Sequence, residues 1–137
     1  MKRIFTAMAA CMLLLTGCGA GDENVRVSKE KIIYLPSDTQ MKSALDEAGY
    51  QTALIGDFDK DGYSILSATN GKTDDEFDGV MVMRAEKAED INAKHNRSGS
   101  AEVDQMRIYA VTDDPTLGNL LITGTDKAIK TAGIKTG

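Results

Sequence analysis

The chain has 137 residues, with 16 basic and 21 acidic side chains, one histidine, two cysteines and no tryptophan. This length suffices for one hydrophobic core and leaves no room for a second domain of ordinary size. The net charge of −5 argues against nucleic-acid binding, which needs a basic surface to meet the phosphates. The single histidine, with both cysteines inside the first 18 residues, excludes zinc sites built from several Cys and His ligands.

Residues 1–17 have the pattern of a secretory signal peptide. Lys2 and Arg3 supply the positive start, and an apolar run from Ile4 to Leu15 follows. A run of about 12 residues is too short for a helix that crosses a hydrocarbon core of ~30 Å. The sequence therefore predicts export and cleavage in preference to a short transmembrane anchor.

The end of this segment, Leu15-Thr16-Gly17-Cys18, resembles the lipobox of bacterial lipoproteins. There the cysteine thiol, a soft nucleophile, receives diacylglycerol, and the chain is cut just before it. We expect lipidation at Cys18, with acyl chains such as palmitate, and anchoring on the extracytoplasmic face of the cell membrane. Without Lys2 and Arg3 the mature chain keeps 14 basic and 21 acidic residues, a net charge of −7. Anionic headgroups repel that charge, so the lipid has to hold the protein.

After the anchor, residues 18–24 are small and polar and predict a flexible tether. An extended segment is expected from Val25 to Leu35. A helix follows, because Ser37 and Gln40 have the spacing of a capping box. Its apolar stripe is formed by Met41, Ala44, Leu45 and Ala48, and Gly49 is expected to end it.

The middle of the chain predicts a hairpin, an acidic loop, a short strand and a second helix. Strands are expected at Tyr50–Ile55 and Tyr63–Thr69, joined by a turn at 56–62, with Tyr63, Ile65 and Ser67 on one face. The acidic loop covers 70–78. The next strand is Val80–Met83, with Met81 and Met83 expected on opposite faces, and the helix runs from Arg84 to about His95.

The last third predicts a polar loop at 96–104 and a second hairpin, whose strands are Met106–Val111 and Leu117–Ile122. A final helix starts at Thr125 or Asp126 and stops at Gly133. Links of hairpin length favour an antiparallel sheet. We therefore expect residues 25–137 to form a single α+β domain with two layers. It would have a mainly antiparallel sheet and about three helices packed on one face.

Four segments carry a resemblance to a family of small, uncharacterised lipoproteins from Gram-positive bacteria. They are Leu45–Tyr50, Leu66–Asn70, Gly118–Thr125 and Ala128–Ile134. Each is a structural motif: a helix end, a strand, or a hairpin that leads into a helix. The resemblance therefore implies a small lipoprotein of this kind and brings no catalytic residue or ligand with it.

One motif, Asp57-x-Asp59-x-Asp61-Gly62, has a chemical mechanism attached. Carboxylates at alternate loop positions converge on a hard cation such as calcium, the glycine permits the sharp turn, and Tyr63 would add its carbonyl oxygen. An EF-hand is excluded, because its twelfth position falls on Ala68, where a glutamate is needed.

Two interpretations of this motif stay open. A calcium loop of another kind would need one more carboxylate, from Asp74, Asp75, Glu76 or Asp78. The alternative is an ordinary hairpin turn, since aspartate and glycine are common turn residues.

No enzyme chemistry is indicated elsewhere. His95 is expected to serve a helix end, no cysteine is available in the mature body, and no serine or carboxylate pair stands out. The expected function is a non-enzymatic binding or interaction role in the cell envelope. The partner would be an unknown envelope protein or small ligand, besides the membrane reached through Cys18. The alternative is a calcium-responsive envelope domain that uses the Asp57-Asp59-Asp61-Gly62 loop, with calcium as the only cofactor considered.

Overall fold

The computed structural model describes residues 25–28, 30–72, 76–87, 99–103 and 106–137. Their strands form a seven-stranded sheet in the order β1-β6-β7-β8-β5-β4-β3, in which every neighbouring pair is antiparallel. The fold is α+β, as the sequence predicts. The strands are β1 (Val25–Ser28), β3 (Gln51–Ile55), β4 (Tyr63–Thr69), β5 (Gly79–Ala85), β6 (Gly99–Val103), β7 (Met106–Asp114) and β8 (Gly118–Gly124).

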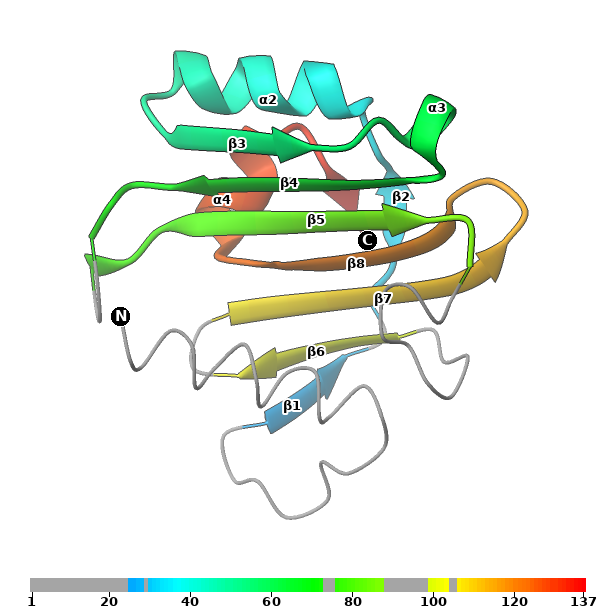
Figure 1. The fold of residues 1–137 in the computed structure, drawn as a ribbon. Helices are drawn as coiled ribbons and strands as arrows, with labels where there is room; N and C mark the ends of the chain where they lie inside the picture. Colours follow the sequence, from blue (N-terminus) through cyan, green and yellow to red (C-terminus); the bar gives the residue numbers. More distant parts are fainter. Residues whose placement is uncertain (1–24, 29, 73–75, 88–98, 104–105) are drawn as a thin grey trace.

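Two of the helices cover one face of this sheet. Figure 1 views the opposite face, so that β4 and β5 pass in front of α4. A two-stranded ribbon of β2 (Ile32–Tyr34) and β9 (Lys135–Thr136) stands beside the helices. The helices are α2 (Asp38–Glu47), the single turn α3 (Phe58–Asp61) and α4 (Asp126–Thr131).

The helix α2 forms for the local reasons that its sequence gives. Ser37 is the N-cap, and its hydroxyl accepts from the Gln40 N–H while the Gln40 side chain accepts from the Ser37 N–H. Met41 and Leu45 are completely buried, one turn apart on the face toward the sheet. The helix ends before Gly49, whose φ of 94° suits glycine.

The helix α4 is built in the same way. Thr125 caps it by accepting from the Ala128 N–H, and Ala128 and Ile129 are buried against the sheet. Together α2 and α4 enclose the main core with the inward side chains of four strands. Those side chains are Leu66, Ala68, Val80, Val82, Tyr109, Leu120 and Ile122.

The face of the sheet turned away from α2 and α4, which we call the second face, also carries apolar side chains. One row crosses five strands, because Ile55 pairs with Ile65, Ile65 with Met83, Met83 with Leu121 and Leu121 with Ala110. Leu121 and Ala110 are buried, Ile65 and Met83 are half-buried, and Ile55 is 57% exposed. The row therefore becomes accessible toward the β3 edge.

Several sequence expectations are wrong. The predicted helix from Arg84 does not begin there, because Arg84 and Ala85 complete β5, and its remainder at 88–95 lies outside the described residues. The predicted polar loop at 96–104 contains β6, whose weak local pattern is overridden by pairing with β7 on one side and β1 on the other. The turn expected at 56–62 is confirmed, since this segment joins β3 to β4, and it contains the single helical turn α3.

Of two assignments of side chains to faces, one is confirmed and one is wrong. Tyr63, Ile65 and Ser67 do share one face, but the buried side of β4 is the other, formed by Ser64, Leu66 and Ala68. Met81 and Met83 lie on the same face and not on opposite faces, because side chains two apart in a strand point the same way.

Candidate functional site

The motif Asp57-x-Asp59-x-Asp61-Gly62 forms the turn between β3 and β4. Asp57 caps α3, and its Oδ1 accepts from the N–H groups of Asp59 at 3.0 Å and Lys60 at 3.3 Å. Asp61 points back, and its Oδ2 accepts from the Asp57 N–H at 3.0 Å. Gly62 ends the turn with a φ of 78°, a conformation that glycine adopts without strain. Two of the three carboxylates therefore hold the turn itself together.

The same geometry bears on the calcium hypothesis. The Tyr63 carbonyl, expected as the next ligand, faces Gly56, since a Cβ built on Gly56 would lie 2.8 Å from that oxygen. Asp78 and Glu76 lie beyond the far end of β4, seven residues or ~23 Å away, so they cannot complete a site at the turn. Within the described ranges, no group of three or more His, Cys, Asp or Glu side chains is arranged to hold a metal ion. Calcium binding here stays a prediction.

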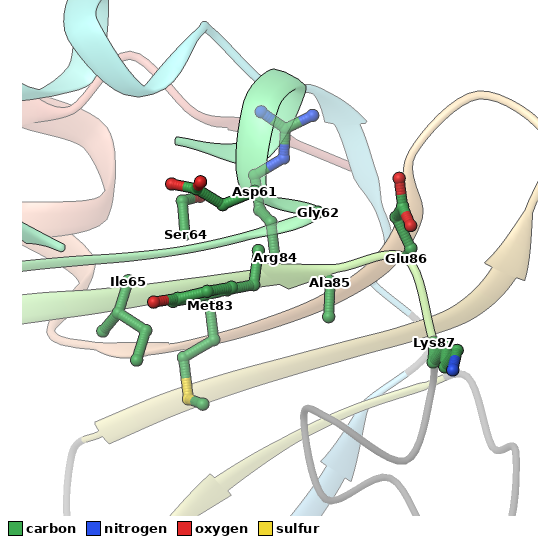
Figure 2. A pocket seen from close by; sticks show the side chains of 10 residues that line it. Asp61, Gly62, Ser64, Ile65, Met83, Arg84, Ala85, Glu86 and Lys87 are labelled. Carbon is green, nitrogen blue, oxygen red and sulfur yellow. The ribbon is translucent and has the colours of Figure 1, made fainter. Parts of the chain in front are cut away.

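A groove of about 410 Å³ lies beside the turn, at the end of the β4–β5 hairpin. Its charged rim includes Asp61, Arg84, Glu86 and Lys87. Figure 2 shows Arg84 reaching toward α3, while Met83 extends to the opposite side of the strand. The groove is thus bordered by charges above and by the apolar row of the second face below.

Arg84 connects the turn to the start of α2. Its guanidinium lies 4.3 Å from the centre of the Phe58 ring, and its Nη1 lies 3.7 Å from Asp38 Oδ1. A cation–π contact of this kind contributes about 0.5–1 kcal/mol where it is partly exposed. Its cross-strand neighbour Ser64 is buried, and the Ser64 hydroxyl makes no hydrogen bond within the described part of the chain.

Two exposed apolar side chains of the large sheet lie together at this same corner. Ile55, the last residue of β3, is 57% exposed, and Tyr63, the first residue of β4, is 44% exposed. The Tyr63 ring lies against Gly56, where an added Cβ would come within 2.9 Å of it. Large apolar groups that gather beside a charged groove are typical of a surface that contacts another molecule.

The opposite end of the β4–β5 hairpin is held by Asp78. Its carboxylate accepts from the hydroxyls of Tyr50 and Thr125, and its backbone N–H donates to Asn70 Oδ1 at 3.1 Å. Burial, and then the bond to Asp78, raise the pKa of Tyr50 to about 12. Lys127 Nζ stands 4.0 Å from the same carboxylate. The sequence predicts Asp78 only as part of an acidic loop and as one possible calcium ligand, so this role is missed.

A second polar cluster joins the β2–β9 ribbon to the sheet. Glu30 accepts from Arg107 at 3.2 Å, from the Tyr109 hydroxyl at 3.1 Å and from the Thr136 hydroxyl. The bond from Thr136 is the main reason that the pKa of Glu30 is lowered, with Tyr109 and Arg107 adding to it against the effect of burial. No spacing in the sequence signals this cluster, because Glu30 and Thr136 are 106 positions apart.

The other predicted functional residues cannot be placed. Cys18, His95, Asp74 and Asp75 lie outside the described residues. In the part of the chain that is described, no helix is both long enough and apolar enough to span a bilayer.

Protein-family models, curated proteins and solved structures were compared with this chain, and none of them matches it. Its function therefore has to be inferred from its own residues.

Proposed function

We propose that the protein is a membrane-anchored lipoprotein of the cell envelope with a non-enzymatic binding role. Lipidation at Cys18 provides the anchor, on the extracytoplasmic side. The support for the anchor is the Leu15-Thr16-Gly17-Cys18 segment directly after the apolar run. The observation that carries the binding role is the exposed corner formed by Ile55 and Tyr63 beside the charged groove.

The position of that corner supports the proposal. β1 and β3 are the two edges of the sheet, six strand spacings or ~29 Å apart. Successive antiparallel pairings give both strands the same direction, so Val25 at the start of β1 and Ile55 at the end of β3 lie at diagonal corners. A tether of residues 19–24 reaches at most ~21 Å. An anchor at Cys18 would hold the Val25 corner near the bilayer and leave the Ile55 corner facing away from it.

The anchor is tested by intact-mass analysis of the protein extracted from its native membrane. The expected mass is that of a chain beginning at Cys18 with a diacylglycerol adduct, and Cys18→Ala should give unprocessed precursor or protein released from the membrane. Cys11→Ala is the matched control and should change neither the mass nor the location of the mature form. An unmodified Cys18 in the membrane form contradicts the proposal.

A calcium-responsive domain is the second candidate, favoured by one observation. Glu86 and Asp61 line the same groove, and a Cβ on Gly62 would lie 3.1 Å from the Glu86 carboxylate carbon. The turn therefore has a further carboxylate close by, from the residue that follows β5 and not from the acidic loop that the sequence suggested. Calcium titration followed by thermal unfolding tests this candidate.

A further inference from the structure

We propose that β3 accepts an extended segment of another polypeptide as an additional antiparallel or parallel strand. That segment would have apolar side chains at alternate positions and Lys or Arg at its ends. The inference names the partner class for the binding role proposed above and rests on that role. It is carried by three features of β3: its free backbone groups, its uncharged sequence and the acidic side chains at both of its ends.

The free backbone groups follow from the hydrogen-bond register. The Glu86 N–H donates to the Gly62 carbonyl at 2.9 Å and the Asn70 N–H to the Asp78 carbonyl at 2.9 Å, so the even-numbered residues of β4 bond to β5. The odd-numbered residues of β4 therefore bond to β3, through Gln51, Ala53 and Ile55. The N–H and C=O groups of Thr52 and Leu54 point away from the sheet. β3 is the last strand of the sheet within the described ranges.

The sequence of β3 lacks the usual protection of a sheet edge. Such edges are commonly blocked by lysine, proline or a bulge, each of which discourages another strand from pairing. β3 reads Gln-Thr-Ala-Leu-Ile, without charge or proline, and pairs with β4 in an unbroken register. The opposite edge strand, β1, carries Arg26. An added strand would also extend the apolar row of the second face, because its side chain opposite Ile55 would join Ile65 and Met83.

The charges around β3 favour a partner segment with positively charged ends. The segments at the two ends of the strand are 42–50, 56–62 and 70–78, and their described residues include seven carboxylates and three lysines. The carboxylates are Asp46, Glu47, Asp57, Asp59, Asp61, Glu76 and Asp78, and the lysines are Lys42, Lys60 and Lys72. Asp46 bonds to the Thr52 hydroxyl, which places one acidic group directly beside the edge. A strand with cationic ends would meet an opposite charge at both ends.

The same charges disfavour a second copy of this chain on the edge. Antiparallel pairing of two β3 strands would set the Asp57–Asp61 turn of each copy against Asp46 and Glu47 of the other. Parallel pairing would set the two turns side by side. Both arrangements bring like charges together across the new ladder, which is unfavourable. The edge is therefore suited to a different polypeptide.

The test uses the full chain as expressed and processed, in detergent micelles, with the synthetic peptide Lys-Lys-Val-Thr-Val-Thr-Val-Lys-Lys as the probe. Amide hydrogen exchange is measured residue by residue. We expect saturating peptide to slow exchange of the Thr52 and Leu54 N–H groups by about tenfold or more, with little change at Ala53. The same peptide with Glu at its ends should bind about tenfold more weakly or worse at low salt.

A pair of variants isolates the backbone contact. Thr52→Pro removes the outward N–H without removing a bond to β4, and it should weaken peptide binding about tenfold. Thr52→Val is the matched control: both substitutions lose the hydroxyl bond to Asp46, but Val keeps the N–H and should bind as the parent does. The exchange measurement on the parent protein decides the matter even where Thr52→Pro does not fold.

Three results would overturn the proposal: no protection of Thr52 and Leu54 by the peptide, equal binding of the Glu-ended peptide, or dimers by ultracentrifugation whose formation protects these amides without peptide. None of these measurements depends on Cys18. An unlipidated Cys18 would therefore contradict the proposed anchor without affecting the strand-addition result. A failed peptide assay would contradict strand addition without affecting the proposed anchor.

Discussion

Two hairpins of the sheet, β3–β4 and β7–β8, end in turns of similar construction, and the first of these turns has more carboxylates. In the β3–β4 turn, Asp57 accepts from two backbone N–H groups and Gly62 closes the turn at a φ of 78°. In the β7–β8 turn, Asp114 accepts from the N–H groups of Thr116 and Leu117, both at 2.8 Å, and Gly118 closes it at a φ of 71°. Both turns thus use one aspartate as an acceptor and one glycine to close, and the second turn also holds Asp113 at a φ of 53° with its N–H donating to Asn119 Oδ1 at 2.8 Å.

The difference lies in the two further carboxylates of the first turn. Asp61 has a local role, because it accepts from the Asp57 N–H. The Asp59 side chain makes no hydrogen bond or ion pair within the described part of the chain. A motif of three aspartates that suggests a metal loop therefore contains two residues explained by the turn and one that is not. Asp59 is the residue that separates a calcium site from an ordinary turn.

The largest expected loss of stability comes from a core substitution outside both turns, and the effects of the turn substitutions can be compared with it. Leu45→Ala removes a completely buried side chain from α2 and should destabilise the protein by about 2–5 kcal/mol. Lys42→Ala on the polar face of the same helix should stay within about 0.5 kcal/mol of the parent, since its partner Asp46 is also exposed. Urea unfolding measures both. Equal effects would mean that the buried face of α2 is misassigned.

The two glycines sharpen the comparison of the turns. Gly62→Ala and Gly118→Ala each place a Cβ on a left-handed residue and should destabilise by about 1 kcal/mol. Gly62→Ala should be the worse of the two, because its Cβ meets the Glu86 side chain at 3.1 Å while nothing lies within 4 Å at Gly118. Thermal unfolding at one pH compares them. A larger loss at Gly118 would contradict the argument from the Glu86 contact at Gly62.

The capping aspartates are expected to behave alike. Asp57→Ala and Asp114→Ala each remove the side-chain acceptor of two backbone N–H groups and should destabilise by about 1 kcal/mol, although the Lys60 N–H keeps its bond to the Asp57 carbonyl. Asp→Asn at the same positions keeps an acceptor oxygen and should recover most of the loss. Chemical denaturation of the four variants measures this. A loss confined to Asp57 would show that the first turn has a function that the second lacks.

Added calcium tests most directly whether the first turn differs from the second in binding a metal ion. If the first turn is ordinary, millimolar calcium changes the Tm little, and Asp59→Asn leaves stability unchanged or slightly higher because a repulsion is removed. A site with a Kd of about 0.1 mM would instead gain about 1.4 kcal/mol at about 1 mM calcium, a shift of several degrees. That gain would disappear in the double variant Asp59→Asn, Asp61→Asn. We expect the first result.

The smallest effect concerns pH. The backbone N–H groups of Leu117 and Thr116 lower the pKa of Asp114 below its ordinary value of 3.8. A carboxylate with a lowered folded-state pKa stabilises the protein above its unfolded-state pKa, and this contribution is lost as the pH falls through the folded-state pKa. Asp114→Asn should therefore flatten the stability profile slightly below about pH 4. Unfolding midpoints compared between pH 2 and 6 test this, and an unchanged slope would contradict it.

Particular elements show which parts of the fold can be predicted from the sequence. α2 is predicted correctly because its capping box, its stripe and its glycine stop all lie within thirteen residues of one another, Ser37 to Gly49. β6 is missed because nothing local in Gly99–Val103 marks a strand, and its pairing with β7 and β1 is what defines it. Asp78 is missed for the same kind of reason: Tyr50 and Thr125 are 28 and 47 positions away.

Part of the candidate site can likewise be predicted from neighbouring residues, and part depends on the whole sheet. The turn at 57–62 and its glycine are readable from adjacent residues, although their helical turn is not. The exposed corner of Ile55 and Tyr63 and the free edge of β3 depend on which strand ends up outermost, and that follows from the order of the whole sheet. A periodicity of two identifies a strand, but it does not say whether the strand has a neighbour on both sides.

The insertion of β8 between β5 and β7 has a consequence for the growing chain. β3, β4 and β5 are consecutive and can pair as soon as residue 85 has emerged, but the outer side of β5 stays unpaired until residues 118–124 follow. During that interval Gly-Val-Met-Val-Met-Arg-Ala is an open and largely apolar edge, the kind of segment from which misassembly starts. Arg84 is its single charge, at the position later paired with Leu120. The side chain that contacts Phe58 and Asp38 in the finished protein is thus also the one charge on the open edge of the half-made sheet.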